Sequence, residues 1–176
     1  VNQFYLSGRL DHEYETGGSV TVETGVTQVE NEVIVTGIGR VQVQRARRPF
    51  GRLSYSGHGF NVNLWSQSRV NMAPEVSLST GLDLIQDANI SQGEVQFHRS
   101  YLDERLFLVA GVSHRIISID TKNTLMIGAR EDNTSGVFGQ AEYRFAPELK
   151  IVTAARFDRA TLHESFFSPK AAIVFS

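Results

Sequence analysis

The sequence predicts an all-β protein built as an antiparallel, up-and-down sheet of about nine strands, and three features lead to this prediction. Apolar and polar side chains alternate along nearly the whole chain, which is the pattern of a strand with two different faces. Tight turns containing Gly, Pro or Asp alternate with much longer connections. No long stretch has helical periodicity, so no helix is expected.

The strands follow from the alternation in chain order. In the first one, Phe4, Leu6 and Leu10 occupy even positions, whereas the odd positions between them are polar or charged apart from Tyr5. The same two-residue period predicts strands near residues 4–14, 19–27, 52–56, 60–64, 94–101, 106–115, 137–145, 149–158 and 170–175. Only the segment 106–112 is apolar on both faces. The predicted sheet therefore has one apolar face and one charged face.

The turns between these strands fall into two groups. Tight turns are expected at 15–18, 56–59, 102–105 and 146–148, and long connections at about 29–48, 67–92, 117–135 and 159–167. Long unstructured loops are uncommon in compact soluble domains. Short turns at one end, long connections at the other, and one apolar face together predict a segment of a transmembrane β-barrel, which is a partial barrel at this length.

Aromatic and polar side chains near the tight turns fit this prediction. An aromatic girdle at the membrane interface explains why several aromatic residues gather there: Tyr14, Tyr55, Phe60, Tyr101, Phe107, Tyr143 and Phe145. His12 and Arg99 interrupt the apolar face, but both lie within a few residues of a tight turn. Their polar ends can reach the headgroup zone from there.

Composition excludes several classes of protein. The 17 basic and 19 acidic residues give a net charge of −2, so a broadly basic nucleic-acid surface is not expected. Cysteine is absent, which excludes disulfides, zinc-thiolate sites and a cysteine nucleophile. The longest apolar run, 106–112, is far shorter than the ~20 residues of a membrane-spanning helix. The chain starts on Val1 without a signal sequence and stops within a strand pattern, so we expect a piece of a longer protein.

No enzyme is expected from the residues. The five histidines are scattered without metal-ligand spacing, and Gly37-Ile38-Gly39 lacks the third glycine of a dinucleotide-binding loop. Asp83, Asp87 and Asn89 form no EF-hand pattern, and solvated loop acids explain them. No cofactor or metal is therefore predicted.

Three segments resemble a known family. The clearest resemblance lies in Phe167-Ser168-Pro169-Lys170-Ala171-Ala172-Ile173-Val174-Phe175-Ser176, preceded by Ala154-Ala155-Arg156-Phe157-Asp158 and by Val137-Phe138-Gly139-Gln140-Ala141-Glu142-Tyr143. These segments resemble the barrel region of TonB-dependent outer-membrane receptors. The resemblance is good over 106–176 and looser over 1–105, and it concerns strand motifs that specify no ligand.

The resemblance implies a 22-stranded barrel with a plug domain inside it, and a short box that contacts TonB; neither plug nor box has a counterpart in residues 1–176. It also implies the outer membrane of a Gram-negative bacterium and energised uptake of a scarce nutrient such as a siderophore, cobalamin, a glycan or a peptide. A passive porin, a small structural barrel and a soluble β-sandwich binding module are the alternatives.

Candidate ligand contacts are few. Loops on a rigid scaffold commonly carry recognition, which makes Arg40, Trp65 and Tyr5 weak candidates. Arg156 is a further candidate among the charges of the polar face, where most such residues only keep a barrel interior wet. This set comprises Arg9, Glu23, Arg52, Glu94, Glu142, Arg144, Lys150, Arg156, Asp158 and Lys170.

Overall fold

The computed structural model describes residues 1–175; Ser176, the last residue of the motif at 167–176, lies outside the described residues. These residues form an all-β structure without a helix. The strands are β1 (Asn2–Glu13), β2 (Ser19–Thr36), β3 (Gly39–Gly57), β4 (Phe60–Ala73), β5 (Glu75–Ser77), β6 (Asp83–Leu84), β7 (Asp87–Tyr101), β8 (Leu106–Asp120), β9 (Arg130–Ala146), β10 (Leu149–Ala160) and β11 (Phe166–Phe175). Within residues 1–175, we find no helix long and apolar enough to cross a membrane.

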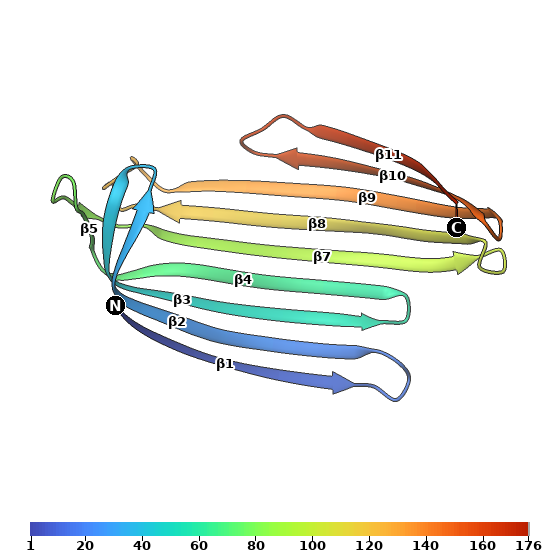
Figure 1. The fold of residues 1–176 in the computed structure, drawn as a ribbon, viewed down its shortest axis with the longest axis horizontal. Coiled ribbons are helices and arrows are strands. Elements are labelled where there is room, and N and C mark those ends of the chain that lie inside the picture. Colours follow the sequence, from blue (N-terminus) through green and yellow to red (C-terminus); the bar gives the residue numbers. More distant parts are fainter. Residues whose placement is uncertain (176) are drawn as a thin grey trace.

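Nine of these strands form one antiparallel, up-and-down sheet. The order β1-β2-β3-β4-β7-β8-β9-β10-β11 follows the chain, and each strand pairs with its neighbours in sequence (Figure 1). The short strands β5 and β6 lie off this path, with β5 paired to β3. The predicted all-β, up-and-down sheet of about nine strands is confirmed. The sheet does not close into a barrel within the described residues, so β1 and β11 are its two edges.

The four predicted tight turns are also confirmed, and all four lie at one end of the sheet. They join β1 to β2, β3 to β4, β7 to β8 and β9 to β10, at the right-hand end in Figure 1. Gly17 and Gly59 adopt positive φ values of 79° and 80°, a backbone conformation that glycine reaches without a steric penalty.

The predicted long connections at the opposite end were wrong in extent. Residues 29–48 form the outer half of the β2–β3 hairpin, whose turn lies at 37–38. The region 67–92 contains the end of β4, both short strands and the start of β7, while 117–135 and 159–167 shrink to connections at 121–129 and 161–165. The strands continue because their main-chain groups find partners well beyond the length that a bilayer requires.

A small hydrophobic core lies at this long-connection end. Val29, Val43 and Ala46 are buried together, and Val41 and Leu84 are buried nearby. Main-chain and side-chain hydrogen bonds tie separate connections to one another: the Leu78 amide donates to the Arg40 carbonyl at 2.9 Å, and the Ile85 amide donates to Thr124 Oγ1 at 3.0 Å. The hairpin, the β5–β6 segment and the 121–129 connection therefore form an ordered cap.

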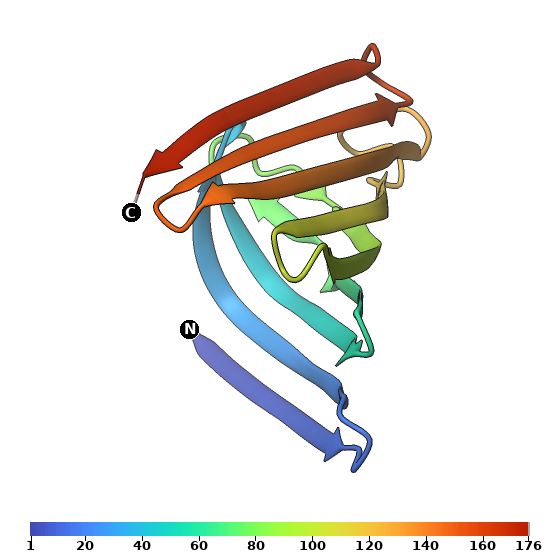
Figure 2. The ribbon, with the colours of Figure 1, turned by 90° about the vertical axis from the view of Figure 1, so that its right-hand side faces the viewer.

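The sheet is curved, and its two faces differ. Figure 2 shows the strands arranged along an arc, with β1 and β11 at its ends. Apolar side chains in two adjacent rows of one face are between 39% and 56% exposed: Val22, Leu53 and Leu64 in one row, and Val95, Val112, Val137 and Phe157 in the other. Their acidic neighbours on the other face, Glu23, Glu94 and Asp158, are less exposed. Side chains on the inside of a curved sheet converge, so the polar face is the concave one.

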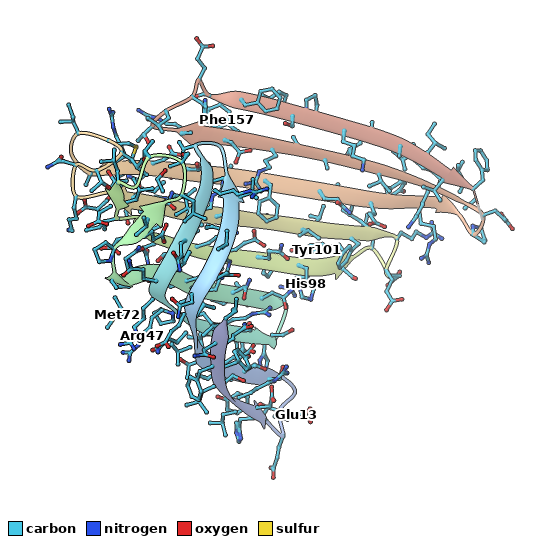
Figure 3. All side chains as sticks on the ribbon, turned by 60° about the vertical axis from the view of Figure 1, so that its left-hand side comes forward. Glu13, Arg47, Met72, His98, Tyr101 and Phe157 are labelled. Carbon is cyan, nitrogen blue, oxygen red and sulfur yellow. The ribbon has the colours of Figure 1, made fainter. Side chains whose placement is uncertain are left out.

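Strand register confirms the position of both interruptions of the apolar face. His12 lies opposite Val20, and Arg99 lies opposite Leu108. The Arg99 guanidinium sits 5.5 Å from the centre of the Tyr101 ring, near the tight-turn end where Figure 3 labels Tyr101 and His98. Phe107, by contrast, does not belong with the aromatic residues of this face: it pairs with Ser100 and Glu142 on the polar face.

Candidate functional site on the polar face

The register places polar side chains from successive strands side by side across the concave face. One row runs through Arg9, Glu23, Arg52, Trp65, Gln92 and Arg115. The next row runs through Asp11, Thr21, Ser54, Asn63, Glu94, Ser113, Gly136 and Asp158. Because neighbouring strands are ~4.8 Å apart, side chains that follow one another in a row are close enough to interact. Gly136 alone contributes no side chain to the second row.

Trp65 lies in a hollow of this face of about 450 Å³. Arg52 stands directly opposite Trp65, and its Nε donates to Asn63 Oδ1 at 3.1 Å and to Ser54 Oγ at 3.2 Å. The remaining walls include Glu23, Phe50 and Gln67. An indole beside a guanidinium, a carboxylate and two amides offers a flat surface and several hydrogen-bonding groups, which is the chemistry of recognition of a polar ligand or a polypeptide segment.

The second predicted candidate on this face, Arg156, is held by a well-defined set of contacts. Its guanidinium forms a forked ion pair with Asp158, with Nε to Oδ2 and Nη2 to Oδ1 both at 2.8 Å. Nη2 also donates to Ser113 Oγ at 3.0 Å, two strands away on β8. The Phe138 ring centre lies 5.5 Å from the guanidinium carbon, a cation–π distance. Arg156 is therefore fixed across β9.

Gly136 makes this arrangement possible. It is the residue of β9 over which the Arg156–Asp158 pair lies, and a Cβ added there would stand 2.7 Å from Arg156 Nη2. Two other glycines of the polar face are covered by an aromatic ring from the residue directly opposite: Gly111 by Phe138, and Gly25 by Phe50. A ring folded over a glycine restores side-chain packing at a position where the strand has none.

The structure does not bring the predicted candidates together. Trp65 on β4 and Arg156 on β10 are four strand spacings apart, or about 19 Å along the sheet. Arg40 lies near the start of β3 in the cap, with its side chain exposed. Tyr5 lies on the polar face of β1, opposite Thr27, and is also exposed. Only the Trp65 hollow and the Arg156 cluster have the surroundings of a built site.

Sequence reasoning missed several residues of these surroundings. Phe50 of β3 beside Trp65, and Ser113 of β8 beside Arg156, come from other strands, so they require the register. Asn63 and Gln67 lie two residues from Trp65 on β4, so the strand period alone could have placed them on its face. The pairing of Arg156 with Asp158 did carry a signal, since residues two apart on a strand share a face.

The cap contains a buried ion pair that the sequence did not indicate. The Glu75 carboxylate is 2% exposed and is bound by the Arg69 guanidinium. It borders a small cavity of about 150 Å³ that Val41 and Leu84 also line. A buried pair of this kind holds the β5 segment against the end of β4.

At the edge of the cap, Lys122 binds Asp120. The ammonium and the main-chain amide of Lys122 both donate to the Asp120 carboxylate, at 2.5 Å and 2.8 Å. These two hydrogen bonds lower the pKa of Asp120 below its ordinary value, with the side-chain bond as the larger cause. The pair fixes the start of the 121–129 connection.

Within residues 1–175 no group of three or more His, Asp or Glu side chains is placed to hold a metal ion. The polar groups of the concave face interact with one another through ion pairs, amide hydrogen bonds and contacts with aromatic rings.

No protein-family model matches the sequence, and no curated protein matches it either.

Proposed function

We propose that this chain is part of a β-barrel in the outer membrane of a Gram-negative bacterium, with its apolar face against lipid. One observation carries the proposal: apolar side chains of neighbouring strands stand side by side across the convex face and remain exposed there, as in the register partners Val95, Val112, Val137 and Phe157. In water this arrangement leaves a large apolar surface uncovered, whereas a bilayer covers it.

The soluble β-sandwich is disfavoured by the same observation. Such a module buries its apolar face under a second layer, and within residues 1–175 the main sheet has no such layer. A bilayer also requires the free edges of β1 and β11 to be paired, because unpaired main-chain groups in hydrocarbon cost several kcal/mol each. Further strands must therefore cover both edges in the membrane.

For the activity, we propose TonB-energised uptake of a scarce nutrient, as the resemblance of the strand motifs implies. The concave polar face supports this proposal, since the Trp65 hollow and the fixed Arg156 side chain offer contacts to a ligand or to a plug. TonB would act through segments other than residues 1–176. The proposal includes no catalytic step and no nucleic-acid partner.

Trypsin treatment of intact cells tests the topology. Lys122 is exposed on a connection at the long-connection end, and Arg105 is exposed at the tight turn between β7 and β8. Barrels of this kind place long connections outside the cell and short turns in the periplasm. We expect cleavage after Lys122 and protection of Arg105 in intact cells, with both sites cut once the protein is in detergent.

Two outcomes would contradict the proposal. Cleavage at Arg105 but not at Lys122 in intact cells reverses the topology, and recovery of the protein in the soluble fraction without detergent excludes the barrel. Nutrient uptake is tested separately: uptake of a labelled siderophore, cobalamin or glycan should stop when the proton gradient is dissipated. Gradient-independent uptake of a solute would instead favour the passive porin.

A further inference from the structure

An apolar hollow on the convex face lies beside a short row of polar side chains. The hollow has a volume of about 580 Å³ and surrounds Gly93, where the face has no side chain. Leu64, Val95, Val112, Val137 and Phe157 form its walls; Figure 3 labels the last of these. A second hollow of about 600 Å³ adjoins it and shares Leu64, Gly93 and His114. Together they form one apolar groove that runs from β3 to β10.

The polar row borders this groove on the side of the long connections. His114 of β8, Ser135 of β9 and Arg159 of β10 are direct register partners, so they span only two strand spacings, or about 10 Å. His114 Nδ1 and Ser135 Oγ are 2.9 Å apart. This contact engages Nδ1, so Nε2 is the ring nitrogen that can face a ligand.

Arg159 supplies the charge of the row. Within residues 1–175 no ion pair engages its guanidinium. The other members of the row are Leu10, Val22, Leu53, Leu64 and Gly93, so the row contains a cation and no carboxylate. A guanidinium can bind two phosphate oxygens at once, and the His114 N–H can bind a third.

The height of the row fits the outer boundary of the membrane. His114 is eight residues from the tight-turn end of β8 at Leu106. At ~3.4 Å per residue and a tilt of about 40°, this places His114 roughly 21 Å from that end, near the far border of an apolar band about 25 Å tall. The long connections are on the same side, so this border faces the outer leaflet.

We propose that this groove binds the phosphorylated acyl-glycolipid of the outer leaflet, lipid A, with an acyl chain over Gly93 and a phosphate at Arg159 and His114. The inference rests on the proposed function, because it needs the convex face to lie in the outer membrane. In the same register row on β2, β3 and β4 the outward residues are Val22, Leu53 and Leu64, so the phosphate contacts are confined to one side of the groove.

Native mass spectrometry of the protein purified from outer membranes tests the proposal. Wild type should retain lipid A, and Arg159→Gln should retain at least about tenfold less, since a charge-assisted hydrogen bond is worth ~1.5–3 kcal/mol. Arg99→Gln is the matched control, because Arg99 is also an arginine of the convex face but lies near the tight turns. It should retain as much lipid A as wild type.

A second variant separates the acyl groove from the charge. Gly93→Leu fills the hollow, and its Cβ would meet only the flexible end of Leu64, at 3.0 Å. It should also lose lipid A while still inserting. The assignment is overturned if Arg159→Gln retains as much lipid A as wild type, or if Arg99→Gln loses as much as Arg159→Gln. It is also overturned if delipidated protein binds added phosphatidylglycerol as well as added lipid A. A protein that fails to insert at all contradicts the barrel proposal instead.

Discussion

Replacing Val112 by arginine gives the sharpest test of what covers the convex face. Val112 lies in a row of apolar residues that crosses the sheet from Val20 to Phe167. It is six residues from the tight-turn end of β8, which at ~3.4 Å per residue and a tilt of about 40° places it roughly 15 Å into the apolar band. The residue should therefore be close to the centre of the bilayer.

This position sets the size of the effect. An arginine facing lipid near the midplane costs about 2–4 kcal/mol, whereas a substitution at a water-exposed site usually changes stability by less than about 0.5 kcal/mol. Val112 is 56% exposed, so a soluble protein should tolerate the change. In a bilayer we expect Val112→Arg to lower the folding equilibrium constant by about 30- to 700-fold, measured by urea unfolding of the protein in lipid vesicles.

Val109→Arg is the matched control because it lies on the same strand and faces the other way. Val109 pairs with His98 and Gln140 on the polar face, where an added charge stays hydrated. It should cost far less than Val112→Arg. If the two variants unfold at the same urea concentration, or if Val112→Arg costs no more than a surface substitution, the assignment of the convex face to lipid is refuted.

Two further predictions concern the polar face and the cap. Gly136→Ala should destabilise the protein by about 1–3 kcal/mol in the same urea assay, because a Cβ would displace the Arg156–Asp158 pair. Gly139→Ala, whose Cβ would meet only a main-chain oxygen at 3.7 Å, should change stability little; equal effects would contradict this account. The pKa of Asp120 is lower in the folded state, so ionised Asp120 stabilises the folded state at every pH above its unfolded pKa of ~3.9. This stabilisation is lost as the pH falls through the folded-state pKa. Amide exchange in 121–129, corrected for its intrinsic rate, should therefore accelerate below the folded-state pKa, and Asp120→Asn should abolish this pH dependence. A variant with the wild-type profile would show that another group is responsible.

The two faces of the sheet could be predicted because alternation is a local property of a strand. Residues such as Val22 and Glu23 point to opposite sides whatever their neighbours do, and the tight turns carry their own glycine, proline or aspartate. Phe107 shows the limit of proximity arguments. It is near a tight turn, but it lies between Leu106 and Leu108 on the same strand and therefore points to the opposite, polar face. The alternation of side chains along the strand was sufficient to predict that face.

The ends of the strands could not be predicted from the thickness of a bilayer. A length of 9 to 11 residues is what a membrane requires of a strand, and it sets no upper limit. Alternation continues through Val33 and Val35 and through Val41 and Val43, on either side of Gly37 and Gly39. This is a hairpin signal, and the chain follows it because the cap buries Val41 and Val43.

The surroundings of the candidate residues depended on register. Arg156 and Asp158 share a face by spacing alone, but Ser113 lies 43 positions earlier in the chain and meets Arg156 across β9. The role of Gly136 likewise follows only when β9 is aligned with β10. Single-sequence patterns identify which face a residue occupies, and contacts between strands require the alignment of one strand on the next.

The direction of the two edge strands bears on which barrel this sheet belongs to. An up-and-down sheet of nine strands has its first and last strands running the same way, so pairing β1 directly with β11 would make one parallel junction in an otherwise antiparallel barrel. All-antiparallel closure needs an odd number of additional strands. A 22-stranded barrel, as the strand motifs imply, leaves 22 − 9 = 13 strands for the remainder, which is odd. The strand count therefore favours closure with an odd number of further strands over a barrel closed by these nine strands alone.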